Sequence, residues 1–253
     1  MDKEKLNEPS TVDDILRKIK EKADTGEYLY RGEPEHYQEY PYYGKVSSNL
    51  YREFLKDGNF DVEAEHFDIE ELQSAMLETA KEFSRKPASE IERLTEIQHY
   101  GGKTNLIDFT EDYLIALFMA CQVSIGKNIT ACNDPFGKES FSKNGRVILQ
   151  KKELINSYIE QPYEPINRVI AQKSIFIRHP DGFISPNEDD VIDIPAMLKQ
   201  PILRHLRNSH GISVEAVYND IHGFIKDQNI HLEVYKAHYI GLTREQRGDS
   251  ENG

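Results

Sequence analysis

The chain of 253 residues contains no tryptophan, only two cysteines and no long hydrophobic run. Cys121 and Cys132 are too few for a disulfide framework or a four-cysteine zinc site, although a mixed His and Cys metal site stays open. The most apolar stretch, residues 113–123, falls short of the roughly 18 residues that a membrane helix needs. The first residues lack the apolar core of a secretory signal. These absences predict a cytoplasmic protein.

Basic residues are also in deficit, since 31 Lys and Arg stand against 44 Asp and Glu and give a net charge of −13. A protein that coats nucleic acid through its overall field needs the opposite balance. Any nucleic-acid contact would therefore be local. Residues 141–210, where basic residues slightly outnumber acidic ones, are the segment that favours an anionic ligand.

Hydrophobic periodicity predicts an α+β fold. Helices are expected over residues 11–24, 61–83, 89–100, 113–123 and 195–210. Short strands are expected over residues 28–32, 106–110, 145–150 and 168–178. Asp112 is placed to cap the apolar helix 113–123, which should be buried.

Domain organisation follows from the lack of any linker between two halves of the chain. We expect a helical N-terminal arm over residues 1–26, a single domain over residues 27–242 and a flexible tail over residues 243–253.

Familiar catalytic motifs are absent, because the chain holds no P-loop, G-x-S-x-G, H-E-x-x-H or C-x-x-C sequence. The histidines have no spacing that supports a metal site. Cys121 lies within the apolar helix, where a core thiol is the simpler interpretation. Three polar clusters instead interrupt apolar patterns, and these are the candidates for a binding site.

The first cluster is Tyr30, Arg31, Gly32 and Glu33. An arginine at the end of a Tyr-rich strand presents a rigid fork of hydrogen-bond donors, and the glycine lets a ligand approach the backbone. The alternative interpretation is an ion pair between Arg31 and Glu33 at the end of a strand.

The second cluster runs from Gln98 to Thr110. A helix ends on His99 and Tyr100, two glycines turn the chain, and a short strand carries Asp108 and Thr110 into the next helix. A strand-to-helix junction of this kind suits an anionic or ribose-bearing ligand. Simple capping of helix amides is the alternative.

The third cluster is Asn167 and Arg168 with Gln172, Ser174 and Phe176, and Gln172 and Ser174 would share one face of strand 168–178. A polar stripe on one face of a strand is usually the solvent face.

Together these clusters resemble the FRG domain family, which is named after its aromatic-Arg-Gly signature. The resemblance is carried by residues 30–32, 47–52, 98–110, 114–120, 168–176 and 211–223. It departs at Gly102 and Lys103, where an apolar residue and Pro are usual, at Phe109, where Trp is common, and at Asn219, where Pro is frequent.

The resemblance implies a remote similarity to ADP-ribosyltransferases: a single α+β domain with a split β-sheet core, flanking helices, and NAD as substrate. The implied catalytic residues are Arg31, Asp108 and Gln172, with Glu215 as a spare carboxylate. The implied NAD-binding residues are Arg31, Gly32, Ser47, Ser48, His99, Tyr100 and Thr110. No metal is implied.

The resemblance also implies a toxin or anti-phage effector with an antitoxin or other inhibitory protein as partner. Its macromolecular target is open. Seven of the 14 Tyr lie between residues 28 and 51 and suit base stacking, so RNA or DNA stands beside protein as a target, although core and loop packing explains the cluster equally. The alternative function is a non-catalytic FRG module that binds a nucleotide or a peptide in the same pocket.

Overall fold

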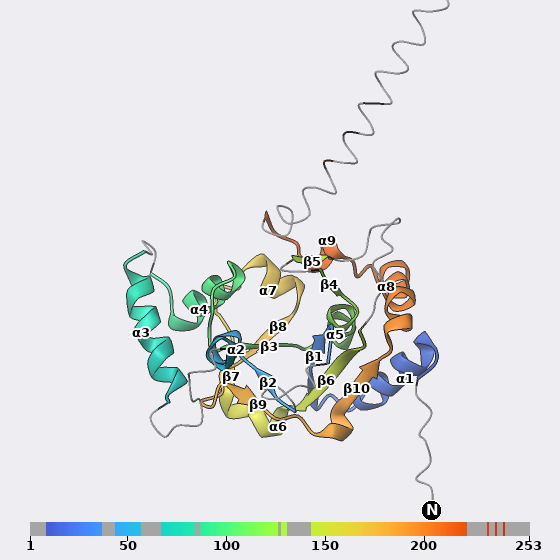
Figure 1. Ribbon diagram of the computed structural model, residues 1–253, viewed down its shortest axis with the longest axis horizontal. Coiled ribbons are helices and arrows are strands. Elements are labelled where there is room, and N and C mark those ends of the chain that lie inside the picture. Colours follow the sequence, from blue (N-terminus) through green and yellow to red (C-terminus); the bar gives the residue numbers. More distant parts are fainter. Residues whose placement is uncertain are drawn as a thin grey trace, which may run out of the picture.

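The centre of the protein is a six-stranded sheet in the order β10–β6–β1–β3–β8–β7, with every neighbouring pair antiparallel (Figure 1). The computed structural model describes residues 9–36, 44–56, 67–83, 87–125, 128–130 and 143–221, with Leu232, Lys236 and Ile240. The sheet strands are β1 (Tyr28–Glu33), β3 (Ile107–Thr110), β6 (Gly145–Lys151), β7 (Ile159–Glu160), β8 (Ser174–Ile177) and β10 (Val191–Ile194). Two small pairs are β2 (Val46–Ser47) with β9 (Phe183–Ile184) and β4 (Val123–Ile125) with β5 (Asn128–Thr130).

Helices flank both ends of this sheet. In Figure 1, α1 and α8 lie beside β10, whereas α3 and α4 lie at the opposite end. The helices are α1 (Val12–Ala23), α2 (Asn49–Lys56), α3 (Ile69–Lys81), α4 (Glu90–His99), α5 (Tyr113–Ala120), α6 (Lys152–Ile155), α7 (Asn167–Ala171), α8 (Ala196–His210) and α9 (Val214–Val217), with 3₁₀ turns η1 (Asn156–Tyr158) and η2 (Glu188–Asp190). The expected α+β class is confirmed. The finer expectation of a split core like that of ADP-ribosyltransferases stays a prediction.

Helix α5 forms the centre of the main core. It is apolar nearly all round, and Ala116 and Leu117 have no exposed surface. The Asp112 carboxylate accepts a hydrogen bond from the Leu114 amide at 2.9 Å, which confirms the expected cap. The helix ends at Ala120, three residues earlier than predicted, and the chain continues into β4.

The N-terminal helix is part of the same core. Thr11 caps α1 in a capping box with Asp14, and Ile15 and Ile19 are completely buried in the cluster that contains α5. The predicted tail, residues 243–253, and residues 61–66 of the helix predicted over 61–83 lie outside the described residues.

The strand predicted over residues 168–178 is wrong in its first half. Residues 167–171 form α7, Gln172 ends this helix, and β8 begins only at Ser174. Between them, Lys173 adopts a left-handed conformation with φ 47°, which turns the chain sharply. A short run of alternating apolar residues does not separate strand from helix, and Pro165 just upstream favours a helix start over a strand.

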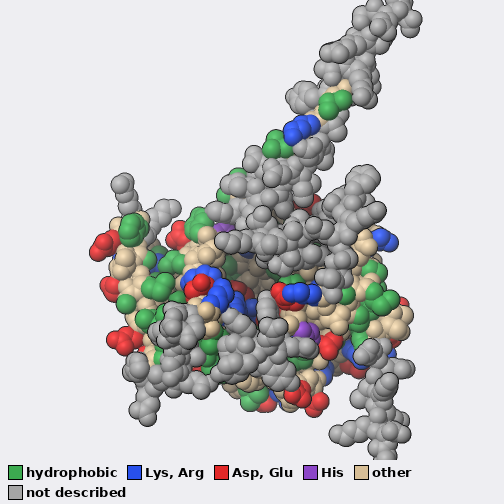
Figure 2. All heavy atoms as spheres, in the orientation of Figure 1, with side chains coloured by type: hydrophobic (Ala, Val, Ile, Leu, Met, Phe, Trp, Pro, Cys, Tyr) green, Lys and Arg blue, Asp and Glu red, His purple; other side chains and the backbone are tan. Residues whose placement is uncertain are grey.

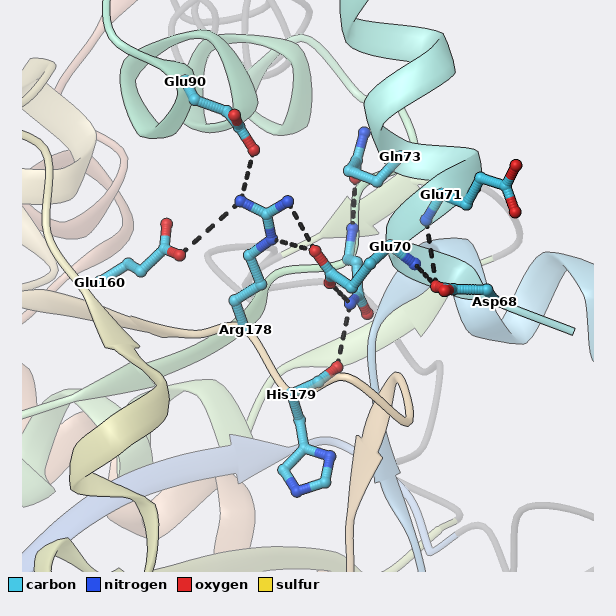
Figure 3. A network of polar contacts seen from close by, with 9 residues as sticks. Asp68, Glu70, Glu71, Gln73, Glu90, Glu160, Arg178 and His179 are labelled. Carbon is cyan, nitrogen blue, oxygen red and sulfur yellow. Dashed lines mark hydrogen bonds and ion pairs between the residues drawn. The ribbon is translucent and has the colours of Figure 1, made fainter.

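An ion-pair network fastens α3 and α4 to the β7–β8 edge of the sheet (Figure 3). Arg178, which follows β8, donates to Glu70 of α3 at 2.7 Å and to Glu90 of α4 at 2.5 Å. Glu160 of β7 lies 3.7 Å from the same guanidinium. Asn105 also contacts Glu70 and donates to the His179 carbonyl at 3.0 Å.

Replacing Arg178 by Met is expected to lower the free energy of unfolding by about 2 kcal/mol, because hydrogen bonds to charged groups contribute about that much. The loss would be read from the chemical-denaturation midpoint. Arg17→Met is the matched control, because Arg17 is 65% exposed and pairs only on the surface of α1. Equal effects of the two variants would contradict this role for the network.

Among the described residues, no helix is both long enough and apolar enough to cross a membrane.

Candidate functional site

A cavity opens beside the strands β1 and β3. These two strands share a single paired position, Tyr30 opposite Thr110. The rest of β1 is not paired with β3. The cavity has a volume of about 370 Å³, within the size range of ligand pockets. Its walls come from β1, β3, α4, α5, α7, β8 and Tyr218 after α9.

Arg31 bridges the separated strands. Its Nη1 donates to the Asp108 carbonyl of β3 at 2.7 Å, and its Nε donates to Glu33 at 3.0 Å. The Glu33 carboxylate also pairs with Arg146 of β6, whose Nε and Nη2 lie 2.9 and 2.7 Å from its Oε2 atom. The partly exposed Arg31 and the buried Arg146 therefore share the Glu33 carboxylate. Burial acts to raise the pKa of Glu33, but the two guanidinium groups outweigh it and lower the pKa.

Replacing Glu33 by Gln is expected to cost about 3–5 kcal/mol of unfolding free energy, because it removes the buried carboxylate that Arg31 and Arg146 share. The contribution of Glu33 is complete above the ordinary Glu range and is lost as the pH falls through its lower, folded pKa. Urea unfolding of the variant should therefore differ most from wild type near neutral pH. The control is Glu78→Gln, because Glu78 is 71% exposed, and comparable losses in both variants would contradict the prediction.

Asp108 presents its carboxylate to the cavity. The side chain is exposed to this space, but the protein around the cavity removes part of its solvation, and this desolvation raises its pKa. Arg31, Gln98 and Arg52 lower the pKa without cancelling the effect of burial. The Gln98 amide donates to both carboxylate oxygens, each at 2.7 Å.

The opposite wall is assembled from α7 and the segment around α9. Arg168 holds Asp220 through two hydrogen bonds of 2.7 and 2.9 Å, and its guanidinium lies 5.1 Å from the centre of the Tyr218 ring. The Gln172 amide donates to the Val217 carbonyl at 3.3 Å. Gln172 thus reaches the cavity from the end of a helix, with its side chain tied to this wall.

The structure brings six of the nine predicted site residues to this cavity: Arg31, Gly32, His99, Asp108, Thr110 and Gln172. Ser47, Ser48 and Tyr100 are not among the residues that line it. Ser48 is 1% exposed and its Oγ accepts from the Tyr51 amide at 3.1 Å at the start of α2, and Tyr100 is 61% exposed. Glu215 is exposed and also does not line the cavity.

Gly32 has a packing role that sequence analysis missed. A Cβ on this residue would lie 1.8 Å from the Ala116 carbonyl oxygen and 2.6 Å from the Ala120 amide nitrogen of α5. The glycine after the arginine therefore lets α5 pack directly on β1, and this contact forms one wall of the cavity.

Gln122 was also missed, because it follows an apolar helix without any motif. It is 3% exposed, lines the cavity and accepts a hydrogen bond from the Tyr218 hydroxyl at 2.9 Å. Its Nε2 has no acceptor among the described residues. A polar side chain at the end of a buried apolar helix is the signal that would have found it.

Charge is unevenly spread over the face seen in Figure 2. Lys and Arg side chains gather near the middle, beside a few Asp and Glu, and many other acidic side chains lie toward the edge. The protein is negatively charged overall, but basic side chains are grouped in one part of this face.

A sequence model of the FRG domain family matches residues 26–128. Over this stretch, which includes Arg31, His99 and Asp108, the chain is similar to FRG domains. The cavity wall formed by α7 and α9 lies beyond the match, and there the resemblance stays a prediction. No curated protein and no solved structure matches the chain.

Proposed function

We propose that the cavity binds NAD and that the protein transfers ADP-ribose from it to a macromolecular acceptor. The observation that carries the proposal is the convergence of Arg31 and Asp108, 77 residues apart, on one cavity of about 370 Å³. A guanidinium anchor beside a carboxylate of raised pKa is a combination that marks functional sites.

The chemistry of the walls fits the parts of NAD. Arg31 supplies a guanidinium group at the cavity wall, which suits the pyrophosphate. Tyr30, Phe109 and Tyr218 provide aromatic faces for a flat ring. Asp108 provides an acceptor for a ribose hydroxyl.

In the proposed reaction, the bond between ribose C1′ and the nicotinamide nitrogen breaks, and its electron pair leaves with neutral nicotinamide. A lone pair on the acceptor forms the new bond to C1′, and the acceptor's proton passes to Asp108. The Asp108 carboxylate also stabilises the positive charge that develops at C1′. A raised pKa suits a group that takes up a proton.

The test incubates purified protein with labelled NAD and cell lysate, and it measures nicotinamide release and label on protein, RNA and DNA separately. Transfer by wild type supports the proposal and identifies the target class. Saturable NAD binding without release would instead assign the protein to the alternative, a non-catalytic binding module. If folded protein neither binds NAD nor releases nicotinamide, both candidate functions are contradicted.

The resemblance extends the proposal to a toxin or anti-phage effector held in check by a partner protein. We expect expression of wild type to slow cell growth and Asp108→Asn to remove the defect at equal protein level. Equal growth defects from both would contradict a role for NAD chemistry in toxicity.

A further inference from the structure

The Gln98 side chain is fixed at both ends. Its Nε2 donates to both oxygens of Asp108 at 2.7 Å, and its Oε1 accepts a hydrogen bond from the Thr104 hydroxyl. An ionised carboxylate only accepts hydrogen bonds and therefore takes the donor end of the amide, while the Thr104 hydroxyl donates to the acceptor end and holds the side chain in this position.

The loop between Gln98 and Thr104 is built to make this contact. Gly101 has φ 89°, and a Cβ on Gly102 would lie 2.8 Å from the Ile97 carbonyl oxygen, so the chain turns back tightly on α4. Thr104 is completely buried, and its amide donates to the Asn49 side chain at 2.7 Å. The two glycines thus position the threonine that holds Gln98.

We propose that Thr104 and Gln98 act together as positioning residues that orient the Asp108 carboxylate and stabilise its ionised form. Two donated hydrogen bonds favour the charged state of a carboxyl group, whereas an amide turned the other way would present an oxygen to it. The role in catalysis rests on the proposed function of Asp108, but the effect on its ionisation does not.

Other groups around Asp108 set the background for this effect. Arg31 of β1 and Arg52 of α2 are the charged groups that act on it electrostatically. His99 of α4 and Arg168 of α7 line the same cavity. From β8, the neighbouring strand, Phe176 lies opposite Asp108 in the register, and Ser174 lines the cavity. None of these groups changes in the variants below.

The experiment follows the Asp108 carboxyl by ¹³C NMR as a function of pH, with the signal assigned by its loss in Asp108→Asn. In Thr104→Val, which keeps shape but removes the hydroxyl, we expect the titration midpoint to rise by about one pH unit. Thr104→Ser should restore the wild-type midpoint. Gln98→Glu places a second carboxylate beside Asp108 and should raise the midpoint further.

Thr95→Val is the matched control. Thr95 also lines the cavity and is 4% exposed, but its hydroxyl donates to the Glu92 carbonyl within α4 at 2.9 Å. Its removal should leave the Asp108 midpoint unchanged. An unchanged midpoint in folded Thr104→Val and Gln98→Glu, or an equal rise in Thr95→Val, would overturn the inference.

A second readout separates this inference from the proposed function. If NAD is consumed, the acidic limb of the rate–pH profile should move with the NMR midpoint in Thr104→Val. A shifted midpoint in a protein that does not consume NAD would leave the inference standing and refute the proposed function. NAD consumption together with an unchanged Asp108 midpoint in Thr104→Val would refute the inference and leave the proposed function standing.

Discussion

Replacing Gly32 by alanine is expected to abolish the native fold or lower its free energy of unfolding by more than about 4 kcal/mol. The added methyl carbon would lie 1.8 Å from the Ala116 carbonyl oxygen of α5. The nearest atoms all belong to the backbone of α5, so no flexible side chain can move aside and α5 must separate from β1. The measurement is the thermal unfolding midpoint of the purified variant.

Gly211→Ala is the control for this prediction. Gly211 has φ 67° and ends α8, but open space surrounds its Cβ position. Its replacement should therefore cost only about 1 kcal/mol of backbone strain. A Gly32→Ala protein as stable as Gly211→Ala would show that α5 does not pack on β1 as described.

Replacing Asp108 by asparagine is expected to reduce NAD turnover by about 100-fold or more and to raise the unfolding temperature. The carboxylate is the group proposed to stabilise charge at C1′ and to take the acceptor's proton, and a neutral amide does neither. The unfolding temperature should rise, because desolvation raises the pKa of Asp108 in the folded state and so makes its ionised form unfavourable there.

The change in unfolding temperature expected for Asp108→Asn depends on pH. A raised folded pKa means that the folded protein binds the proton more tightly than the unfolded chain, so ionisation destabilises the fold. The penalty is absent below the ordinary Asp range and grows as the pH rises toward the folded pKa. The gain in unfolding temperature from Asp108→Asn should therefore appear at neutral pH and vanish in acid.

Asp181→Asn serves as the control, because Asp181 is 65% exposed in the turn after β8 and does not line the cavity. It should change neither turnover nor unfolding temperature. A loss of stability in Asp108→Asn would indicate a structural role for the carboxylate.

Local signals in the sequence predicted much of the architecture. The predicted cap Asp112 starts α5, and the helices predicted over residues 89–100 and 195–210 correspond to α4 and α8. Strands β1 and β6 lie within one residue of their predicted ends. These features depend on neighbours in the chain, which is why propensity and periodicity identify them.

The site was less predictable because it depends on contacts between distant segments. The sequence pointed to Arg31 and Asp108 but not to the separation of β1 from β3, since a strand's partner lies elsewhere in the chain. Gln172 was placed on a strand because its alternating neighbours fit two periods, and the turn at Lys173 carries no sequence mark. Ser48 resembled a ligand residue but caps α2 instead.

The glycines are a second example of contacts that the sequence alone does not identify. Gly32 and Gly102 pointed to close approach of the backbone, and close approach is what the structure shows. The approaching group in each case is another part of the protein, α5 for Gly32 and the end of α4 for Gly102. Sequence alone does not distinguish a ligand from a packed helix.

The measurement that bears most directly on the cavity is calorimetric titration of NAD into wild type and Asp108→Asn, paired with nicotinamide release from the same samples. We predict saturable binding to both proteins and release by wild type alone, because Arg31 remains while the reacting carboxylate is lost. Equal release by both proteins, or no heat of binding with folded wild type, would contradict the assignment of Arg31 and Asp108 to one NAD molecule.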